Sequence, residues 1–145
     1  GHLLGELLVQ ALQHRFNDDL PRPDLLLPVP LASRRLRQRG FNQAAMLARW
    51  VSAGLDIPCD ERLLLRVQDT DAQQDLNAEA RKKNLRNAFA LAPGAAFKDR
   101  HLALLDDVLT TGATAQALAR LLRDAGAARV DVYCLARTPK PGESP

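Results

Sequence analysis

Two adjacent carboxylates and a hydroxyl-rich loop are the residues of this sequence best suited to chemistry. Asp106 and Asp107 follow the apolar run 101–105, and the loop Thr110, Thr111, Gly112, Ala113 and Thr114 then begins an amphipathic segment. Backbone amides at a helix N-terminus lie at the positive end of the helix dipole and bind phosphate. Glycine lets the backbone approach a ligand closely, and threonine hydroxyls add donors. Carboxylates before such a loop can accept hydrogen bonds from sugar hydroxyls, so the pattern predicts a sugar-phosphate site.

The same residues have plainer interpretations. Thr111 is a suitable N-cap for the helix expected at 112–125, and this is compatible with phosphate binding. Paired acids after a strand also hold magnesium in receiver domains and in metal-dependent phosphatases. The complete order of strand, two acids, threonine-rich loop and helix is far more restrictive than the acid pair alone. It favours the sugar-phosphate interpretation.

A basic segment at 33–40 is the second stretch with chemical character, and it follows the apolar run 24–30. A charge run is usually a solvated face. Here the segment leaves the carboxyl end of an expected strand, at the sheet edge where Asp106 is expected. Its four arginines are therefore candidates for binding a pyrophosphate group: Arg34, Arg35, Arg37 and Arg39.

The elements that must position these residues alternate between apolar strands and amphipathic helices. In an open parallel sheet, ligands bind beyond the carboxyl ends of the strands, which brings the acids and the basic segment to one edge. The alternation predicts an α/β domain with a mainly parallel, twisted sheet flanked by helices. Helices are expected at 3–16, 42–54, 78–85 and 112–125, and strands at 24–30, 62–67, 88–91, 101–105 and 129–135.

Particular residues are expected to shape these helices. The second helix is expected to end at Gly54 and the helix at 112–125 at Gly126, because glycine often follows the last helical turn. Trp50 is expected in the core. The first helix is expected to turn one apolar face toward the core, with Leu4, Leu7, Leu8, Ala11 and Leu12 on it.

One domain is expected at residues 1–137, followed by a flexible tail at 138–145. The strongly polar stretch 68–87 lies inside a region of about 62–91 that is expected to form a small hood. A long polar segment within a compact domain is more often a functional lid than a plain connector.

Composition adds few constraints on function. The net charge is +3, from 20 Lys and Arg against 17 Asp and Glu, which is too small to indicate nucleic-acid binding by itself. No apolar run is long enough to cross a bilayer. Cys59 and Cys134 stand far apart and form no CxxC pair, so they indicate neither a metal cluster nor a disulfide framework and favour the cytoplasm. Each is expected to be a small buried residue.

The stretch LALLDDVLTTGAT, residues 102–114, closely resembles the motif with which type I phosphoribosyltransferases bind 5-phosphoribosyl-1-pyrophosphate (PRPP). The resemblance implies that Asp106 and Asp107 contact the ribose 2- and 3-hydroxyls. It implies that the loop 110–114 holds the 5-phosphate. Magnesium would be held mainly through PRPP, with the two acids as further candidate ligands.

The resemblance narrows to the ComF (competence protein F) group and covers residues 24–137. That group has a Pro-Val-Pro strand, matched at 28–30, an arginine-rich loop, and an Arg-Gly-Phe-Asn-Gln motif, matched at 39–43. It also has a spaced pattern that is matched here by Arg66, Thr70, Gln73, Leu76, Arg81, Asn84, Ala88 and Phe89.

Two functions follow from this resemblance. The first is magnesium-dependent phosphoribosyl transfer with release of pyrophosphate, linked to DNA uptake and natural competence, with an unidentified acceptor. The alternative is a non-catalytic PRPP-sensing module that binds single-stranded DNA through the basic segment and through hood cations: Arg81, Lys82, Lys83 and Arg86. Full-length members carry an N-terminal zinc-binding cysteine cluster, and this stretch of sequence contains no such cluster.

Overall fold

The main sheet of the computed structural model has three parallel strands in the order β1-β4-β5. Residues 2–30, 43–67, 79–80, 85, 87–109 and 112–137 are described by the structure. The strands are β1 (Leu25–Pro28), β4 (His101–Leu109) and β5 (Arg129–Arg137). Leu25 pairs with Leu102, and His101 pairs with Arg129. The carboxyl ends of all three strands therefore lie at one edge of the sheet.

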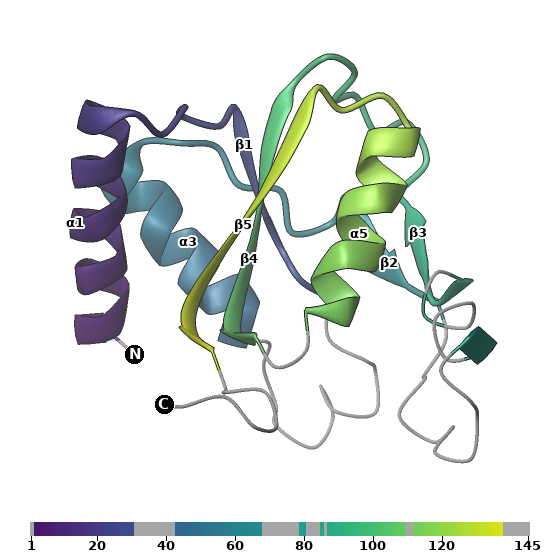
Figure 1. Ribbon diagram of the computed structural model, residues 1–145, viewed down its shortest axis with the longest axis horizontal. Helices are drawn as coiled ribbons and strands as arrows, with labels where there is room; N and C mark the ends of the chain where they lie inside the picture. Colours follow the sequence, from purple (N-terminus) through teal and green to yellow (C-terminus); the bar gives the residue numbers. More distant parts are fainter. Residues whose placement is uncertain are drawn as a thin grey trace.

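Helices cover both faces of this sheet (Figure 1). Helices α1 (His2–Asp18) and α3 (Gln43–Leu55) pack on one face, and α5 (Ala113–Asp124) packs on the other. The strands separate two apolar clusters, because successive side chains of a strand point to opposite faces. Leu102 and Leu104 belong to the cluster that includes α5, whereas Ala103 and Leu105 belong to the cluster beneath α1 and α3.

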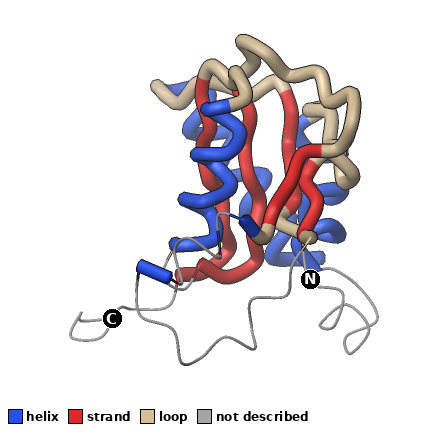
Figure 2. The backbone as a smooth tube through the Cα atoms, turned by 90° about the vertical axis from the view of Figure 1, so that its right-hand side faces the viewer, coloured by secondary structure: helices blue, strands red, loops and turns tan. Residues whose placement is uncertain are grey.

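A second, smaller sheet lies beside the main one (Figure 2). Strand β2 (Leu64–Arg66) pairs antiparallel with β3 (Phe89–Leu91), and Leu64 faces Leu91 in the register. Both strands fall inside the region expected to form the hood. Of the polar stretch between them, the described residues Glu79, Ala80, Leu85 and Asn87 are helical.

Helix α1 contradicts part of the predicted apolar face. Leu12 is buried, but Leu7 is 52% exposed and Ala11 is exposed. Leu8 of the predicted face also packs against the core, and the side of α1 that meets the core extends to Gly5, which is buried, and Val9, which is half-buried. Gly5 and Val9 were not part of the predicted face. These two positions meet α3, and this helix–helix contact turns the predicted face partly toward solvent.

The predictions for α3 need two corrections. Helix α3 continues through Gly54 to Leu55, so Gly54 does not end it. A Cβ on Gly54 would lie 2.8 Å from a methyl carbon of Val9, which shows that this glycine makes room for α1. Trp50 was expected in the core but is 40% exposed, because it lies at the margin where α1 crosses α3.

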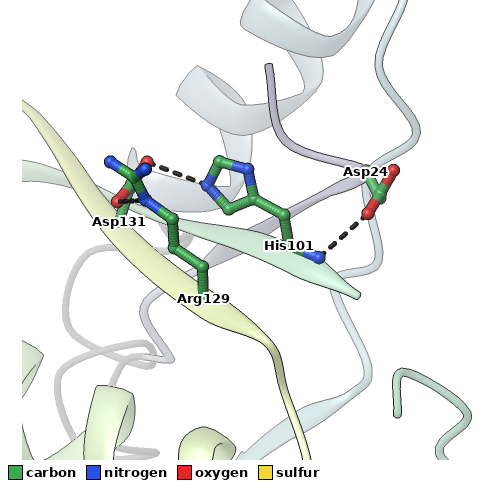
Figure 3. A network of polar contacts seen from close by, with 4 residues as sticks. All are labelled: Asp24, His101, Arg129 and Asp131. Atoms are coloured by element: carbon green, nitrogen blue, oxygen red, sulfur yellow. Dashed lines mark hydrogen bonds and ion pairs between the residues drawn. The ribbon is translucent and has the colours of Figure 1, made fainter. Parts of the chain in front are cut away.

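A polar network joins the amino ends of the three strands (Figure 3). His101 donates its backbone N–H to Asp24 Oδ2 at 2.9 Å, and its Nε2 lies 2.8 Å from Asp131 Oδ2. Arg129 Nε donates to the other oxygen of Asp131 at 2.9 Å. We call this arrangement the His101 network. It stabilises the sheet edge opposite the predicted site.

Two sequence predictions concern membrane spans and the basic and C-terminal segments. No helix among the described residues has the length and apolar character to span a membrane. The basic segment 33–40 and the predicted tail 138–145 both lie outside the described residues.

Candidate functional site

The two predicted carboxylates belong to strand β4 itself. The sequence predicted that this strand would end at Leu105, but β4 continues to Leu109. The reason is its partner: β5 extends to Arg137, and the register pairs Asp106 with Cys134 and Leu109 with Arg137. Asp106 and Asp107 are therefore positioned by a paired backbone rather than by a loop.

Asp106 is on the α5 side of the sheet. Leu102 and Leu104 pack in the α5 cluster, and strand alternation places Asp106 on the same face. Its side chain is half-buried. Ala115 and Leu118 of α5 are buried in turn, so the first turns of this helix are held close to the sheet. Asp106 and the beginning of α5 thus face one another.

The first turn of α5 starts at a glycine. Gly112 is the N-cap, with φ 80° and ψ 0°, and it has no side chain to form a capping hydrogen bond. The prediction that Thr111 is the N-cap was wrong by one residue. The Gly112 carbonyl accepts from Gln116 N at 2.9 Å, which closes the first helical turn. Ala113 and Thr114 follow in this turn and are half-buried.

The conformation of Gly112 explains why this position suits a glycine. Among the described residues, no atom would lie within 4 Å of a Cβ placed there, so crowding by these residues is not the constraint. The left-handed backbone is the constraint, since side chains disfavour it. Open space in front of a helix N-terminus is what a bound phosphate needs.

Strand β1 ends next to Asp106. Pro28 pairs with Leu105, and Val29 N donates to the Leu105 carbonyl at 2.9 Å. The chain therefore leaves β1 at the edge that carries Asp106, as the sequence predicted. The side chain of Asp107 lies outside the description, as do the following candidate residues: Arg34, Arg35, Arg37, Arg39, Thr110 and Thr111.

Sequence reasoning missed one neighbour of the site. Cys134 is half-buried on β5, directly across from Asp106 in the register. The interpretation of this cysteine as a plain core residue overlooked that a parallel partner strand brings its own side chain to the same edge. The position of Cys134 near the carboxyl end of the strand predicted at 129–135 already indicated that it would lie at this edge.

The side chains at this edge suit a magnesium ion that takes most of its ligands from a bound phosphate compound and few from the protein. Among the residues that the structure describes, no three His, Cys, Asp or Glu side chains gather into a metal-binding group. Magnesium commonly takes one or two carboxylates and completes its shell with phosphate oxygens and water. The half-buried Asp106 carboxylate fits that pattern.

Comparison with known proteins gives the chain its relatives. DNA utilization protein YhgH of Escherichia coli strain K12 is 42% identical over 132 residues, which is 91% of this chain and 57% of that protein. Competence protein F of Haemophilus influenzae is 43% identical over 136 residues, 92% of this chain and 59% of that protein. The chain is a homologue of competence protein F. It spans somewhat more than half the length of the curated relatives it matches, and no protein-family model matches it.

Solved structures identify the fold of this competence protein F homologue as the type I phosphoribosyltransferase fold. A purine phosphoribosyltransferase from Pyrococcus horikoshii superposes with a TM-score of 0.61 at 18% identity, covering 100% of this chain and 80% of that one. Glutamine PRPP amidotransferase from Bacillus subtilis gives 0.59 at 19% identity, covering 91% of this chain and 25% of that one. Both predictions, of the ComF resemblance and of the fold, are confirmed.

Proposed function

We propose that this competence protein F homologue binds PRPP with magnesium at the carboxyl edge of its main sheet. The observation that carries the proposal is the placement of Asp106, half-buried on β4, opposite the left-handed Gly112 that begins α5. The carboxylate offers acceptors for sugar hydroxyls, and the helix N-terminus that it faces offers backbone N–H donors for a phosphate at the same edge.

Each part of the motif has a role in this proposal. Asp106 and Asp107 accept hydrogen bonds from the ribose 2- and 3-hydroxyls. Backbone amides at the start of α5, together with the loop 110–114, hold the 5-phosphate. The hydroxyl of Thr114 adds a donor within the first helical turn. Gly112 gives this loop its left-handed turn without a side chain in the way of the ligand.

Transfer of the phosphoribosyl group follows from these contacts. The bond between the anomeric carbon and the pyrophosphate oxygen breaks, and pyrophosphate leaves with the electron pair. An acceptor nucleophile bonds to that carbon and loses its proton. Arg34, Arg35, Arg37 and Arg39 stabilise the leaving pyrophosphate. Magnesium, when bound, supplies charge neutralisation of the phosphate oxygens. The segment that includes β2 and β3 covers the ligand and excludes water.

A role connected with DNA uptake is proposed from the relatives, which are called DNA utilization and competence proteins. A second candidate function combines the proposed PRPP site with the DNA named in the first of these relatives. The domain would bind PRPP as a signal, without turnover, and would bind single-stranded DNA. The two candidates share the PRPP site and differ in whether pyrophosphate is released.

Calorimetric titration of PRPP, with magnesium and with a chelator, tests the shared site. We expect magnesium-dependent binding by the wild type and at least tenfold weaker binding by Asp106→Asn, the loss of about one charge-assisted hydrogen bond. Asp124→Asn is the matched control, because Asp124 lies at the other end of α5 and is 73% exposed.

The titration tests the PRPP site, and a second assay distinguishes the enzyme from the sensing module. No binding of PRPP by a folded wild type, or equal loss in both variants, would contradict the proposed site. Where PRPP binds, a pyrophosphate-release assay over candidate acceptors distinguishes the enzyme from the sensing module. Sustained release of pyrophosphate that depends on an acceptor would establish the transferase.

A further inference from the structure

Three exposed cations surround the turn at 125–128, at the sheet edge opposite Asp106. Lys98 and Arg100 precede β4, and Arg123 lies in the last turn of α5; all three side chains are exposed. None of them forms an ion pair with any residue that the structure describes. We call this surface the basic turn.

Backbone hydrogen bonds hold the basic turn together. Asp99 N donates to the Gly126 carbonyl at 2.8 Å, and Ala128 N donates to the Arg100 carbonyl at 2.9 Å. Gly126 N also donates to the Arg123 carbonyl at 3.0 Å. These bonds join the segment before β4 to the end of α5, so the three cations stand on one fixed framework. A framework of this kind lowers the entropy lost when the cations engage a ligand.

Neighbouring acids offset only part of this charge. Asp131 is bound by His101 and by Arg129, and Asp124 lies 3.9 Å from Arg120. Asp99 is exposed beside Lys98 and Arg100. Asp24 also lies at this edge, where its carboxylate accepts from His101 N. With Asp124 and Asp131 paired to their own cations, the three cations of the basic turn face only Asp24 and Asp99, so a small excess of positive charge remains.

Stabilisation of the helix end explains only one of the three cations. Arg123 in the last turn of α5 interacts favourably with the negative end of the helix dipole. Lys98 and Arg100 lie outside any helix, and Lys98 packs its aliphatic stem near Gly126, since a Cβ there would lie 3.2 Å from Lys98 Cγ. Lys98 is nevertheless exposed, and it forms no ion pair with a described residue.

We propose that the basic turn binds the phosphate backbone of single-stranded nucleic acid. This inference rests on the DNA-linked part of the proposed function and names a surface for it. Arg100 and Asp106 stand near the two ends of β4, and six residues of strand span about 20 Å. The basic turn and the PRPP site therefore lie at opposite edges of the sheet (Figure 1), and both can be occupied at once.

The test compares two double variants with equal charge change. Lys98→Gln/Arg100→Gln removes two cations of the basic turn, and Arg15→Gln/Arg62→Gln removes two exposed cations elsewhere. Binding of a labelled thymidine oligonucleotide of about 20 nucleotides, longer than one module covers, is followed by fluorescence anisotropy at several salt concentrations.

Each lost phosphate contact should lower the salt slope of the affinity by about 0.7. The first variant should therefore lose about 1.4 of slope and bind roughly 25-fold more weakly near 0.1 M salt, while the control stays within about twofold. Equal loss in both variants, or a wild type that binds heparin but not the oligonucleotide, would overturn the proposal. Titration of PRPP into the same variants separates this outcome from failure of the PRPP site, because that binding should be unchanged.

Discussion

The indole of Trp50 rests directly on Gly5. A Cβ placed on Gly5 would lie 2.5 Å from Cδ1 of Trp50, closer than any real contact. The reverse contact occurs about one turn along, where Val9 of α1 packs on Gly54 of α3. In each helix, therefore, a large side chain of the other helix packs against a glycine, and these two contacts determine how α1 packs on α3.

Gly5→Ala should destabilise the protein despite alanine's better helix propensity. That propensity contributes about 0.5–1 kcal/mol, whereas overpacking costs about 1–3 kcal/mol. We expect a net loss of about 1 kcal/mol in the free energy of unfolding, measured in urea, with a change in Trp50 fluorescence. Gln10→Ala, on the exposed side of α1, serves as the control. A Gly5→Ala protein as stable as this control would contradict the packing account.

Gly112 can be tested against a glycine of matching geometry. Gly112 has φ 80° and Gly94 has φ 78°, and a Cβ on either would meet no atom within 4 Å in the part of the chain that the structure describes. Alanine at either position should cost about 1 kcal/mol of stability, since the left-handed conformation is disfavoured. Only Gly112→Ala should also weaken binding of PRPP in calorimetry. Equal effects of both variants on PRPP binding would argue against a phosphate site at α5.

Tyr133→Phe should stabilise the protein. Tyr133 is 6% exposed, and among the described residues its hydroxyl has no hydrogen-bond partner. An unsatisfied buried hydroxyl costs about 1–3 kcal/mol of desolvation, so its removal should raise the free energy of unfolding by about 1 kcal/mol. Thermal unfolding measures this change, and a clear loss of stability would show that the hydroxyl has a partner.

Tyr133→Phe should also make the free energy of unfolding less sensitive to high pH. Burial, with a contribution from the Asp131 carboxylate, raises the pKa of Tyr133 from 10.0 to about 12. Because the pKa is raised in the folded state, the contribution to stability is complete below about pH 10 and is lost as the pH rises toward 12. Wild type should lose more stability than Tyr133→Phe over that window in urea titrations.

Cys59 should react slowly with thiol reagents. Burial raises the pKa of its thiol from 9.0 to about 11, and the carboxylates of Glu61 and Asp60 add to this effect. At pH 8 the thiolate fraction should fall by about 100-fold, and the reaction rate with it. Cys134→Ala leaves Cys59 as the single thiol to measure. Glu61→Gln in that background should speed the reaction, since it removes a carboxylate and frees Arg49 from its ion pair.

The His101 network predicts an order of stabilities. Asp131→Ala leaves the mostly buried His101 ring without its 2.8 Å partner and should cost about 1–3 kcal/mol. Arg129→Ala removes only a half-exposed partner of Asp131 and should cost less than about 1 kcal/mol. Equilibrium unfolding near neutral pH gives both values. Similar losses in the two variants would contradict the structural role assigned to His101.

The sequence predicted the layers of the fold well because apolar strands and helices alternate so clearly. Strands at β1, β4 and β5 and the helix α5 all appear near their expected positions. The predictions that failed concern tertiary contacts. The apolar face of α1 and the end of α3 depend on the contacts that Gly5 and Gly54 make with the other helix. The hydrophobic periodicity of one helix contains no information about the helix that packs against it.

The candidate site was predictable in composition but not in its detailed geometry. The order of residues around Asp106 and Gly112 predicted a strand followed by a helix start, and both are present. That this helix start binds phosphate stays a prediction. The extension of β4 past Leu105 could not be predicted, since it depends on pairing with β5 as far as Arg137. The N-cap moved from Thr111 to Gly112 because the turn takes a left-handed backbone, which is easiest for glycine.

The His101 network also bears on the order in which the chain folds. His101 meets Asp131 across 30 residues of chain, but meets Asp24 across 77. Loop-closure entropy makes the longer connection about 0.8 kcal/mol costlier. The unit of β4, α5 and β5 carries Asp106 and Gly112 together, and it can assemble from local contacts alone. We therefore expect β1 to pair with β4 after this unit has formed, so that Asp106 and Gly112 come together before the main sheet is complete.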